Sequence, residues 1–388
     1  MNTPLPSMTA TTFAPPVMEA RRWIAEAPRD RALLNLSQAA PTEPPPELLV
    51  QAMAEAVLND PAAHVYGPVL GLPALREAVA ARWSADYAGQ IASEDVAVTA
   101  GCNQAFCSAI AALARPGDNV ILPVPWYFNH AMWLEMMGIE ARPLASAADI
   151  CPDPEALKID ARTRAIVLVT PNNPTGVEYA PALIEQFAEV ARRHGIHLIL
   201  DETYRDFGSS EGPAHALFTD PEWREIVVHL YSFSKVFRLT GHRTGVIIAA
   251  PTLLTEAEKF LDTVAICPPQ VGQVAALAGL ERLDAWVAGE RAEVLRRGEA
   301  ARAGLSSLPG WRLRGAGAYF AYVEHPFADP SDHVARRLVR EAGVLLLPGT
   351  MFAPTGDAAG ARSLRIAFAN ADTTGIAELV RRLAALDT

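Results

Sequence analysis

The sequence predicts an α/β protein with a mostly parallel sheet, helices on both faces of that sheet, and a second, smaller domain. The chain of 388 residues is longer than one small domain, and 50% of its residues are hydrophobic, which is enough for a large core. Near-continuous apolar runs alternate with helical patterns such as 105–114 and 181–194, as is typical of parallel sheets covered on both faces. The strand-like runs are 95–99, 119–122, 165–170, 197–201, 226–232 and 246–249.

The residues before this region predict an arm and a linker. A proline-rich lead precedes a short helix over 17–27 and a strand-like run over 32–37. Prolines over 41–46 then interrupt regular structure, and the amphipathic pattern of 47–59 predicts a helix. A turn-rich segment leads into a further helix that is expected to end near Tyr87.

The pattern changes after about Gly272. A long helix is expected to run through Leu283 and Arg297, and a compact unit of strands and helices follows it. The runs 315–323 and 363–368 alternate like antiparallel strands. We expect these elements to form the smaller domain.

The composition excludes several classes of function. The formal net charge of -11, without any basic run, argues against a nucleic-acid-binding surface and favours small-molecule chemistry. The N-terminus lacks the features of a signal peptide, and no apolar stretch reaches the roughly 20 residues that span a bilayer. We therefore expect a cytoplasmic protein that binds no metal, nucleic acid or membrane. Its four cysteines lack metal-ligand spacing and are expected to be thiols of a reducing compartment: Cys102, Cys107, Cys151 and Cys267.

One strand-like run leads into a turn that carries Lys235. The other two lysines of the chain, Lys158 and Lys259, lie among acids in segments that are expected to face solvent. Phe233 and Phe237 flank Lys235, and partial desolvation lowers the pKa of a lysine and makes its amine a nucleophile able to form a Schiff base. The alternative is a surface lysine that follows a strand.

The residues around Lys235 resemble the signature of a known family. The string Ser232-Phe233-Ser234-Lys235, followed by Thr240-Gly241-x-Arg243-x-Gly245, is similar to the cofactor-lysine signature of the class I/II aminotransferases, the fold-type I pyridoxal-phosphate enzymes. The resemblance extends from about Asn35 to Arg365. It implies that Lys235 carries pyridoxal 5'-phosphate as a Schiff base, and that Ser232, Ser234 and Arg243 bind the phosphate.

The resemblance also implies the organisation of the chain. A seven-stranded sheet between helices would form the large cofactor-binding domain over residues 49–277. The smaller α+β domain would combine an N-terminal segment, 1–48, which includes the arm, with the C-terminal segment 278–388.

Two further strand ends carry residues suited to this cofactor. Gly101 permits a tight turn before a helix begins, and the free N–H groups and positive dipole end of a helix favour a phosphate. The resemblance implies that Gly101, Cys102 and Asn103 face that phosphate. The string 173–176, Asn-Pro-Thr-Gly, resembles one of the most specific motifs of the family, and Asn173 is expected to donate to the phenolic oxygen and to contact the substrate. An ordinary turn is the alternative.

Asp201 ends an apolar run, where an ionised carboxylate is costly unless it is paired. A protonated pyridine nitrogen would hold it ionised, and this pair would keep the cofactor ring an electron sink. The resemblance implies that Tyr204 hydrogen-bonds the phenolic oxygen. Asp201, Tyr204 and Lys235 are therefore the expected catalytic residues.

Aromatic residues follow the second strand-like run. Such residues often belong to a core, but the resemblance implies that Tyr127 stacks on the pyridine ring. It also implies that His130 hydrogen-bonds the carboxylate under that ring. A surface position on a helix is the alternative for His130.

Arg365 lies among apolar neighbours, where a guanidinium needs an anionic partner. The resemblance implies that it binds the α-carboxylate of the substrate, and a salt bridge inside the smaller domain is the alternative. Relatives usually carry a glycine and an acid in a substrate-contacting loop where Ala39 and Ala40 stand here. Further candidates for the substrate pocket are Trp126, Tyr319 and His242, whose position is often aromatic in relatives.

Tyr66 suggests a homodimer. The resemblance implies that this tyrosine reaches the cofactor phosphate of the neighbouring subunit, so that two subunits share their active sites. Packing within a loop is the alternative.

Together these residues predict an aminotransferase that moves an amino group between an L-amino acid and a 2-oxo acid by a ping-pong mechanism, with Lys235 as general base and then acid. A β- or γ-eliminating lyase handles the cofactor in the same way and is a second possibility. A non-catalytic ligand sensor is a third possibility. The expected lack of a DNA-binding segment ahead of residue 30 counts against it, and so does the presence of Lys235, Asp201, Asn173 and Arg365. The amino acid side chain stays open.

Overall fold

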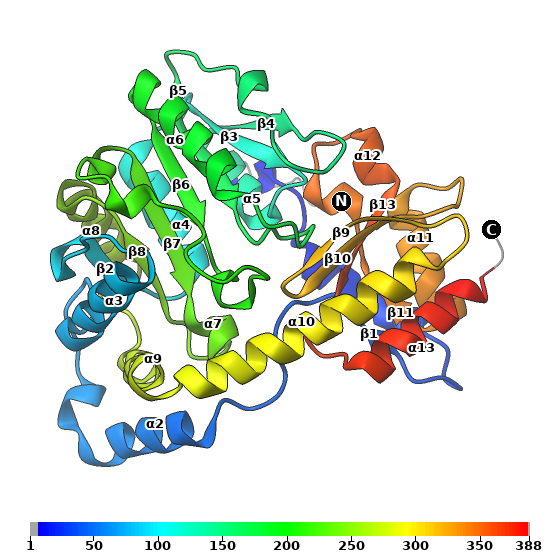
Figure 1. Cartoon of the computed structure of the whole chain (residues 1–388), viewed down its shortest axis with the longest axis horizontal. Helices are drawn as coiled ribbons and strands as arrows, with labels where there is room; N and C mark the ends of the chain where they lie inside the picture. Colours follow the sequence, from blue (N-terminus) through cyan, green and yellow to red (C-terminus); the bar gives the residue numbers. More distant parts are fainter. Residues whose placement is uncertain (1–6, 387–388) are drawn as a thin grey trace.

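The computed structural model describes residues 7–386. Its largest element is a seven-stranded sheet with the order β2-β8-β7-β6-β5-β3-β4 (Figure 1). Strand β8 runs antiparallel to both neighbours, and every other neighbouring pair is parallel, which confirms the predicted mostly parallel sheet. The strands are β2 Val96–Thr99, β3 Asn119–Val124, β4 Glu140–Ala145, β5 Thr163–Val169, β6 His197–Asp201, β7 Val227–Ser232 and β8 Gly245–Ile248.

Helices cover both faces of this sheet, because successive residues of a strand point to opposite sides. In β5, Ile166 and Leu168 belong to the apolar core that includes residues of α2, α3, α6 and α9. Ala165 and Val167 belong to the core that includes residues of α4, α5 and α8 on the other face. The helices of this region are α2 Glu47–Asn59, α3 Pro73–Asp86, α4 Cys102–Leu113, α5 Phe128–Met136, α6 Pro181–His194, α7 Phe233–Val236, α8 Pro251–Ala265 and α9 Gln270–Arg282.

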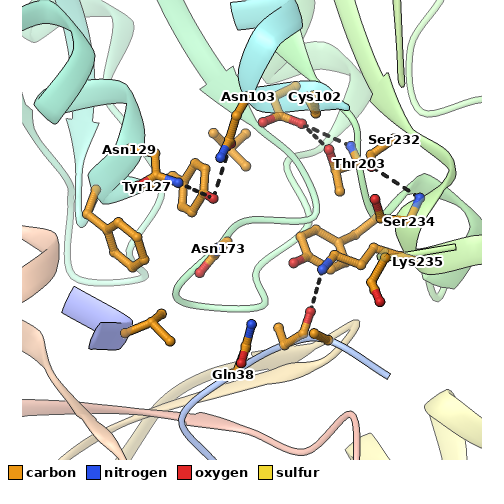
Figure 2. Close-up of a pocket in the computed structure, with 18 of the residues that line it drawn as sticks. Gln38, Cys102, Asn103, Tyr127, Asn129, Asn173, Thr203, Ser232, Ser234 and Lys235 are labelled. Atoms are coloured by element: carbon orange, nitrogen blue, oxygen red, sulfur yellow. Dashed lines mark hydrogen bonds between the residues drawn. The ribbon is translucent and has the colours of Figure 1, made fainter. Parts of the chain in front are cut away.

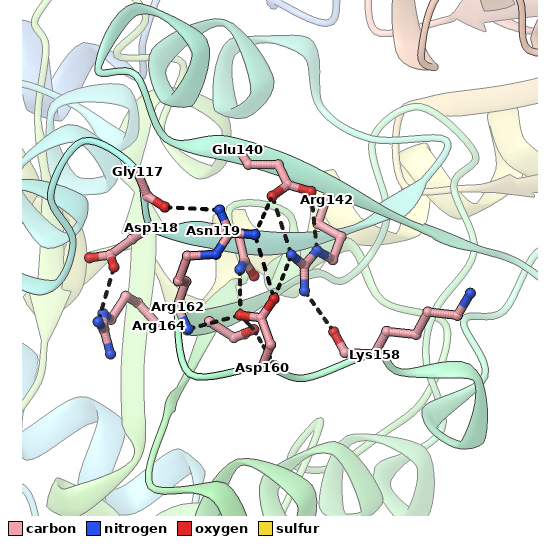
Figure 3. A network of polar contacts seen from close by, with 10 residues as sticks. Gly117, Asp118, Asn119, Glu140, Arg142, Lys158, Asp160, Arg162 and Arg164 are labelled. Atoms are coloured by element: carbon pink, nitrogen blue, oxygen red, sulfur yellow. Dashed lines mark hydrogen bonds and ion pairs between the residues drawn. The ribbon is translucent and has the colours of Figure 1, made fainter.

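The edge strand β4 is missing from the strand-like runs of the sequence because it has little apolar pattern. Leu144 is its one buried residue, and Pro143 is compatible with a strand that has a partner on one side only. Ion pairs hold its polar residues, since Arg142 lies 3.2 Å from Glu140 and 2.9 Å from Asp160 (Figure 3). These contacts join the beginning of β4 to the loop before β5.

A smaller unit combines both ends of the chain. Its four-stranded antiparallel sheet has the order β12-β13-β10-β9. The N-terminal β1 pairs in parallel with β11, and Trp23 and Leu36 lie in the same core as C-terminal residues. The domain boundaries 1–48, 49–277 and 278–388 stay a prediction. The elements are α1 Pro16–Trp23, β1 Leu34–Asn35, α10 Asp284–Ser306, β9 Arg312–Gly317, β10 Phe320–Glu324, α11 Ser331–Arg337, β11 Val344–Leu345, β12 Leu347–Pro348, α12 Ala358–Ala361, β13 Ser363–Ala367 and α13 Thr373–Ala384.

Two expectations for this region are wrong. The run 315–323 is not one strand, because a turn at Ala318 and Tyr319 separates β9 from β10. Ala318 adopts a positive φ of 44°, which neither its residue type nor the alternating pattern indicates. The expected long helix is two helices, since α9 ends at Arg282 and α10 begins at Asp284, with φ of -114° at Leu283.

Within residues 7–386, no helix has the length and the apolar character needed to cross a membrane. The same residues contain no group of three or more His, Cys, Asp and Glu side chains arranged to hold a metal ion. The four cysteines are all free thiols.

Candidate active site

A cavity of about 320 Å³ opens at the carboxyl ends of the central strands, between the large sheet and the smaller unit. Figure 2 shows side chains from both parts around it, with Tyr127 and Lys235 on opposite sides and Asn173 between them. The residues that line it are Val17, Gln38, Ala39, Ala40, Cys102, Asn103, Tyr127, Phe128, Asn129, Val169, Asn173, Asp201, Thr203, Tyr204, Ser232, Ser234, Lys235, Thr240, Arg243 and Arg365.

Lys235 lies on the short helix α7, directly after β7. The side chain of Ser232 caps this helix by accepting a hydrogen bond from the Ser234 backbone at 3.2 Å. Burial, together with the nearby cations Arg243 and Arg365, lowers the pKa of Lys235 to about 8. The Lys235 Nζ donates a hydrogen bond to the Ala39 carbonyl at 2.5 Å. The amine is therefore partly buried, directed into the cavity and without an ion-pair partner.

Asp201 ends β6 at the bottom of the cavity and is 4% exposed. Its Oδ1 accepts hydrogen bonds from the Thr203 backbone at 3.1 Å and from the Thr203 hydroxyl at 2.7 Å. The His130 Nε2 lies 3.5 Å from Oδ2, and the His130 ring stacks on Phe106 at 3.9 Å. Burial alone would raise the pKa of Asp201, but His130 and Thr203 outweigh burial and hold the pKa below its usual value. Asp201 is therefore an ionised carboxylate beneath the cavity.

The loop between β2 and α4 forms another wall. Gly101 has a φ of 89°, and a Cβ atom at this position would lie 2.2 Å from the Arg243 Nη2. Arg243 donates to the Thr240 carbonyl at 2.9 Å, to the Ser234 hydroxyl at 3.4 Å and to the Ala100 carbonyl at 3.4 Å. All these partners are neutral oxygens. An anion could therefore bind here, between the Arg243 guanidinium, the hydroxyls of Ser232 and Ser234, and the free N–H groups at the start of α4.

Tyr127, at the start of α5, stands on the opposite side. Its hydroxyl donates to the Asn103 Oδ1 at 3.3 Å and accepts from the Asn129 Nδ2 at 2.8 Å (Figure 2). Burial, together with the negative charge of Asp201, raises the pKa of Tyr127 to about 12. The ring is thus held in place by hydrogen bonds at its tip.

Arg365 on β13 is 2% exposed. Its Nη1 donates to the Asn173 Oδ1 at 3.0 Å, its Nη2 donates to the Ser37 carbonyl, and its buried Nε has no hydrogen-bond partner. The guanidinium lies over the rings of Phe352, at 4.9 Å, and Phe320, at 5.3 Å. Burial lowers its pKa to about 10. A buried cation with only neutral partners and a free donor calls for an anionic ligand, so the alternative of an internal salt bridge is not realised.

Six expected residues do not line the cavity. Tyr319 is buried behind it, with its ring 5.8 Å from Tyr204 and 4.8 Å from Phe207, because the turn between β9 and β10 directs it away from the cavity. Trp126 belongs to the core shared with α4 and α8, and His242 lines an adjoining hollow. Tyr66 is 75% exposed on the surface. His130 and Gly101 support cavity residues from behind, and His130 is buried rather than on the surface.

The sequence interpretation missed several residues of the wall. Thr203 could have been found, since a residue two positions after an aspartate often donates to its carboxylate. Asn129 and Phe128 adjoin the expected Tyr127. Val17 and Gln38 come from the arm, and no local pattern indicates that they approach the cavity.

The residues present fit a phosphorylated aldehyde with a basic ring nitrogen. Arg243 and the carboxylate of Asp201 line one cavity together with the amine of Lys235. Lys235 follows β7, which lies between β6, where Asp201 stands, and β8, which follows Arg243. Arg365 is a second cation without an anionic partner and could bind a carboxylate. Asn173 adds a side-chain amide to the same wall.

Comparisons with known proteins agree with this geometry. The family model described as "Aminotransferase class I and II" matches residues 31–383. The aspartate/prephenate aminotransferase of Thermus thermophilus is 30% identical over 310 residues, covering 75% of this chain and 77% of its own. The valine–pyruvate aminotransferase of Mycobacterium tuberculosis is 28% identical, and the match covers 95% of both chains. A substrate-bound structure of BacF from Bacillus subtilis superposes with a TM-score of 0.89 at 27% identity, over 99% of this chain and 98% of that one.

Proposed function

Because this chain belongs to the class I and II aminotransferase family, we propose that it holds pyridoxal 5'-phosphate in the cavity and transfers amino groups between an L-amino acid and a 2-oxo acid by a ping-pong mechanism. The main support for this proposal is that one cavity contains Lys235, whose pKa is lowered, and the ionised Asp201. The same cavity contains Arg243 and Arg365, two cations whose hydrogen-bond partners are all neutral. The relatives named above are all aminotransferases, and none of these names points to an eliminating lyase.

Each part of the cofactor has a counterpart in the wall. Arg243, Ser232, Ser234 and the backbone of 101–103 would hold the phosphate. Asp201 would pair with the ring nitrogen, Asn173 and Tyr204 with the phenolic oxygen, and the Tyr127 ring would limit tilting. When bound, the cofactor supplies an aldehyde for the amine and a ring that accepts electrons from the substrate Cα.

The chain's own residues then orient the substrate and move its proton. Arg365 would bind the α-carboxylate through its free donor, and Tyr127 would limit movement on the opposite side. The Lys235 Nζ, once released, would take the proton from the Cα, because a pKa of about 8 leaves roughly a tenth of the amine neutral at pH 7, far more than for an ordinary lysine.

We further propose a homodimer in which Tyr66 contributes to the phosphate site of the second subunit. The segment 65–67 lies against the connection between α8 and α9, since the Gln270 side chain donates to the Val65 carbonyl and the Gly67 N–H donates to the Cys267 Sγ. Val65, Tyr66, Val264 and Ile266 are exposed on these adjoining segments, and neighbouring exposed apolar residues often mark an interface. The free thiols support a cytoplasmic location.

Reconstitution with pyridoxal 5'-phosphate tests the proposed function. Borohydride reduction should attach the cofactor mass to the peptide that contains Lys235, and Lys235→Ala should lose both this adduct and amino transfer. Lys259→Ala is the matched control, because Lys259 forms an exposed ion pair with Glu256. Undiminished transfer by Lys235→Ala would reject the proposal.

A further inference from the structure

The charged residues of the cavity wall are few. The lysines and arginines that line it, among residues 7–386, are Lys235, Arg243 and Arg365, and its one carboxylate is Asp201. Residues 1–6 and 387–388 contain no lysine or arginine in their sequence. In the proposed function all four charges have partners: the aldehyde, the phosphate, the α-carboxylate and the ring nitrogen. A charged group on the substrate side chain would therefore lack a partner.

The wall residues without a role in the proposed function carry no charge: Val17, Ala39, Ala40, Phe128 and Val169 are apolar, and Gln38, Asn129, Thr203 and Thr240 are neutral and polar. Ala39 lies directly beside the reacting amine, because its carbonyl accepts the hydrogen bond from the Lys235 Nζ. Val17 from α1 and Ala40 continue this wall, and Phe128 begins the opposite one. The Phe128 ring is 5.4 Å from Phe352, which lies under the Arg365 guanidinium. A side chain leaving the Cα between Lys235 and Arg365 therefore meets alkyl and aromatic surface.

The cations nearest to the cavity do not line it. The Arg21 Nη2 donates to the Gln38 Oε1 at 3.1 Å, and Arg21 is exposed, so water hydrates its guanidinium. Arg238 pairs with Glu43 at 2.5 Å and with Glu290 at 2.7 Å.

The surface proposed to meet a second subunit would add no cation either. Residues 58–75, which include Tyr66, contain no lysine or arginine, and neither do residues 260–281, which include Ile266. The same two ranges carry the exposed apolar residues of the proposed interface.

We propose that the preferred amino donor has an uncharged, apolar side chain, aliphatic or aromatic, rather than an acidic or basic one. This inference rests on the proposed function, since it assumes that the four wall charges are occupied as described. An acidic or basic side chain would lose hydration against Val17, Ala39 and Phe128 without gaining a partner, which is far more costly than burying an apolar group.

The test is the first half-reaction of the cofactor-loaded enzyme, followed by the change in cofactor absorbance, with leucine, phenylalanine and methionine against aspartate, glutamate and lysine. We expect kcat/KM for the best apolar amino acid to exceed that of each charged one by about 100-fold or more. A charged amino acid that reacts as fast as leucine overturns the inference but leaves the proposed function intact. If no amino acid reacts, the proposed function fails, and this inference fails with it.

Two variants sharpen the test. Val17→Arg places a cation in the apolar wall, and we expect it to lower the leucine-to-aspartate ratio of kcat/KM by about tenfold or more. Arg21→Gln changes the rim cation one helical turn away and should leave this ratio unchanged. If Arg21→Gln instead reduces a substantial rate with aspartate, Arg21 recognises an acidic side chain and the inference is wrong. An unchanged ratio in a Val17→Arg protein that is folded by circular dichroism also contradicts it.

Discussion

At the scale of single residues, the site depends on buried charges that are compensated unequally. Lys235 and Arg365 face neutral partners, and burial lowers the pKa of both. Asp201 is also buried, but His130 and Thr203 keep it ionised. The cavity thus combines a stabilised anion, Asp201, with the cations Lys235 and Arg365, which an anionic ligand would stabilise.

Thr203→Val should weaken the binding of the cofactor. The substitution removes the 2.7 Å hydrogen bond from the Thr203 hydroxyl to Asp201, which raises the pKa of Asp201 and weakens its pairing with a cationic ring nitrogen. Because hydrogen bonds to charged groups contribute about 1.5–3 kcal/mol, we expect the cofactor Kd to rise roughly tenfold or more. An absorbance titration measures this. Thr203→Ser keeps the hydroxyl and should bind normally, so equal losses in both variants would contradict the assigned role.

The lowered pKa of Lys235 predicts a pH dependence of stability in the cofactor-free protein. A lysine with a lowered pKa binds fewer protons in the folded than in the unfolded chain, so the free energy of unfolding rises with pH between about 8 and 10.5. Lys235→Met removes this pH-dependent contribution to the free energy of unfolding. The variant should therefore have a higher Tm than wild type at pH 7, and the difference should shrink by pH 10. Thermal unfolding at both pH values checks this, and a constant difference would count against it.

At the scale of elements, the functional residues lie where strands end. Asp201 ends β6, Lys235 follows β7 and Gly101 precedes α4, so the parallel arrangement of the sheet brings them to one edge. The sequence pattern predicted this because these strands are continuous apolar runs. It did not predict β4, whose residues are held by ion pairs, or the turn between β9 and β10, where Ala318 carries no turn signal.

Gly101→Ala should impair the anion site at the start of α4. A Cβ atom would be strained at a φ of 89° and would displace the Arg243 guanidinium. We expect a loss of about 1–3 kcal/mol in the free energy of unfolding and at least about tenfold weaker cofactor binding, by denaturant unfolding and absorbance titration. Gly117→Ala is the matched control, since Gly117 has a φ of 92° but open space around its Cα. It should lose stability only, and normal cofactor binding by Gly101→Ala would contradict this role.

At the scale of the whole molecule, the cavity is completed by chain segments that are distant in sequence. That Asn173, Asp201 and Lys235 meet in one cavity was predictable, because each lies at or just after the end of a strand of the sheet. The positions of Val17 and Gln38 were not, because they depend on how the arm packs against the C-terminal segment. The buried place of Tyr319 was equally unpredictable, since the turn before β10 decides it.

A shared active site predicts complementation between inactive subunits. In a heterodimer of Lys235→Ala and Tyr66→Ala, one site would carry both substitutions and the other neither. Refolding the two variants together at equal concentration should restore up to about a quarter of the wild-type specific activity, since half of the dimers would be mixed and half of their sites intact. The control mixture of Lys235→Ala with Asp201→Ala should stay inactive. A mixture no more active than the mean of its parents would contradict a shared site.

The pairing of β1 with β11 sets a condition on biosynthesis. β1 emerges from the ribosome early, but Val344 and Leu345 are added only when most of the chain has been translated. Until then the strand that leads to Ala39 and Ala40 lacks its hydrogen-bonding partner, and a nascent chain has one wall of its cavity missing. Capture of a ligand therefore has to wait for the last part of translation, and a message truncated before codon 344 yields a polypeptide that cannot close its pocket.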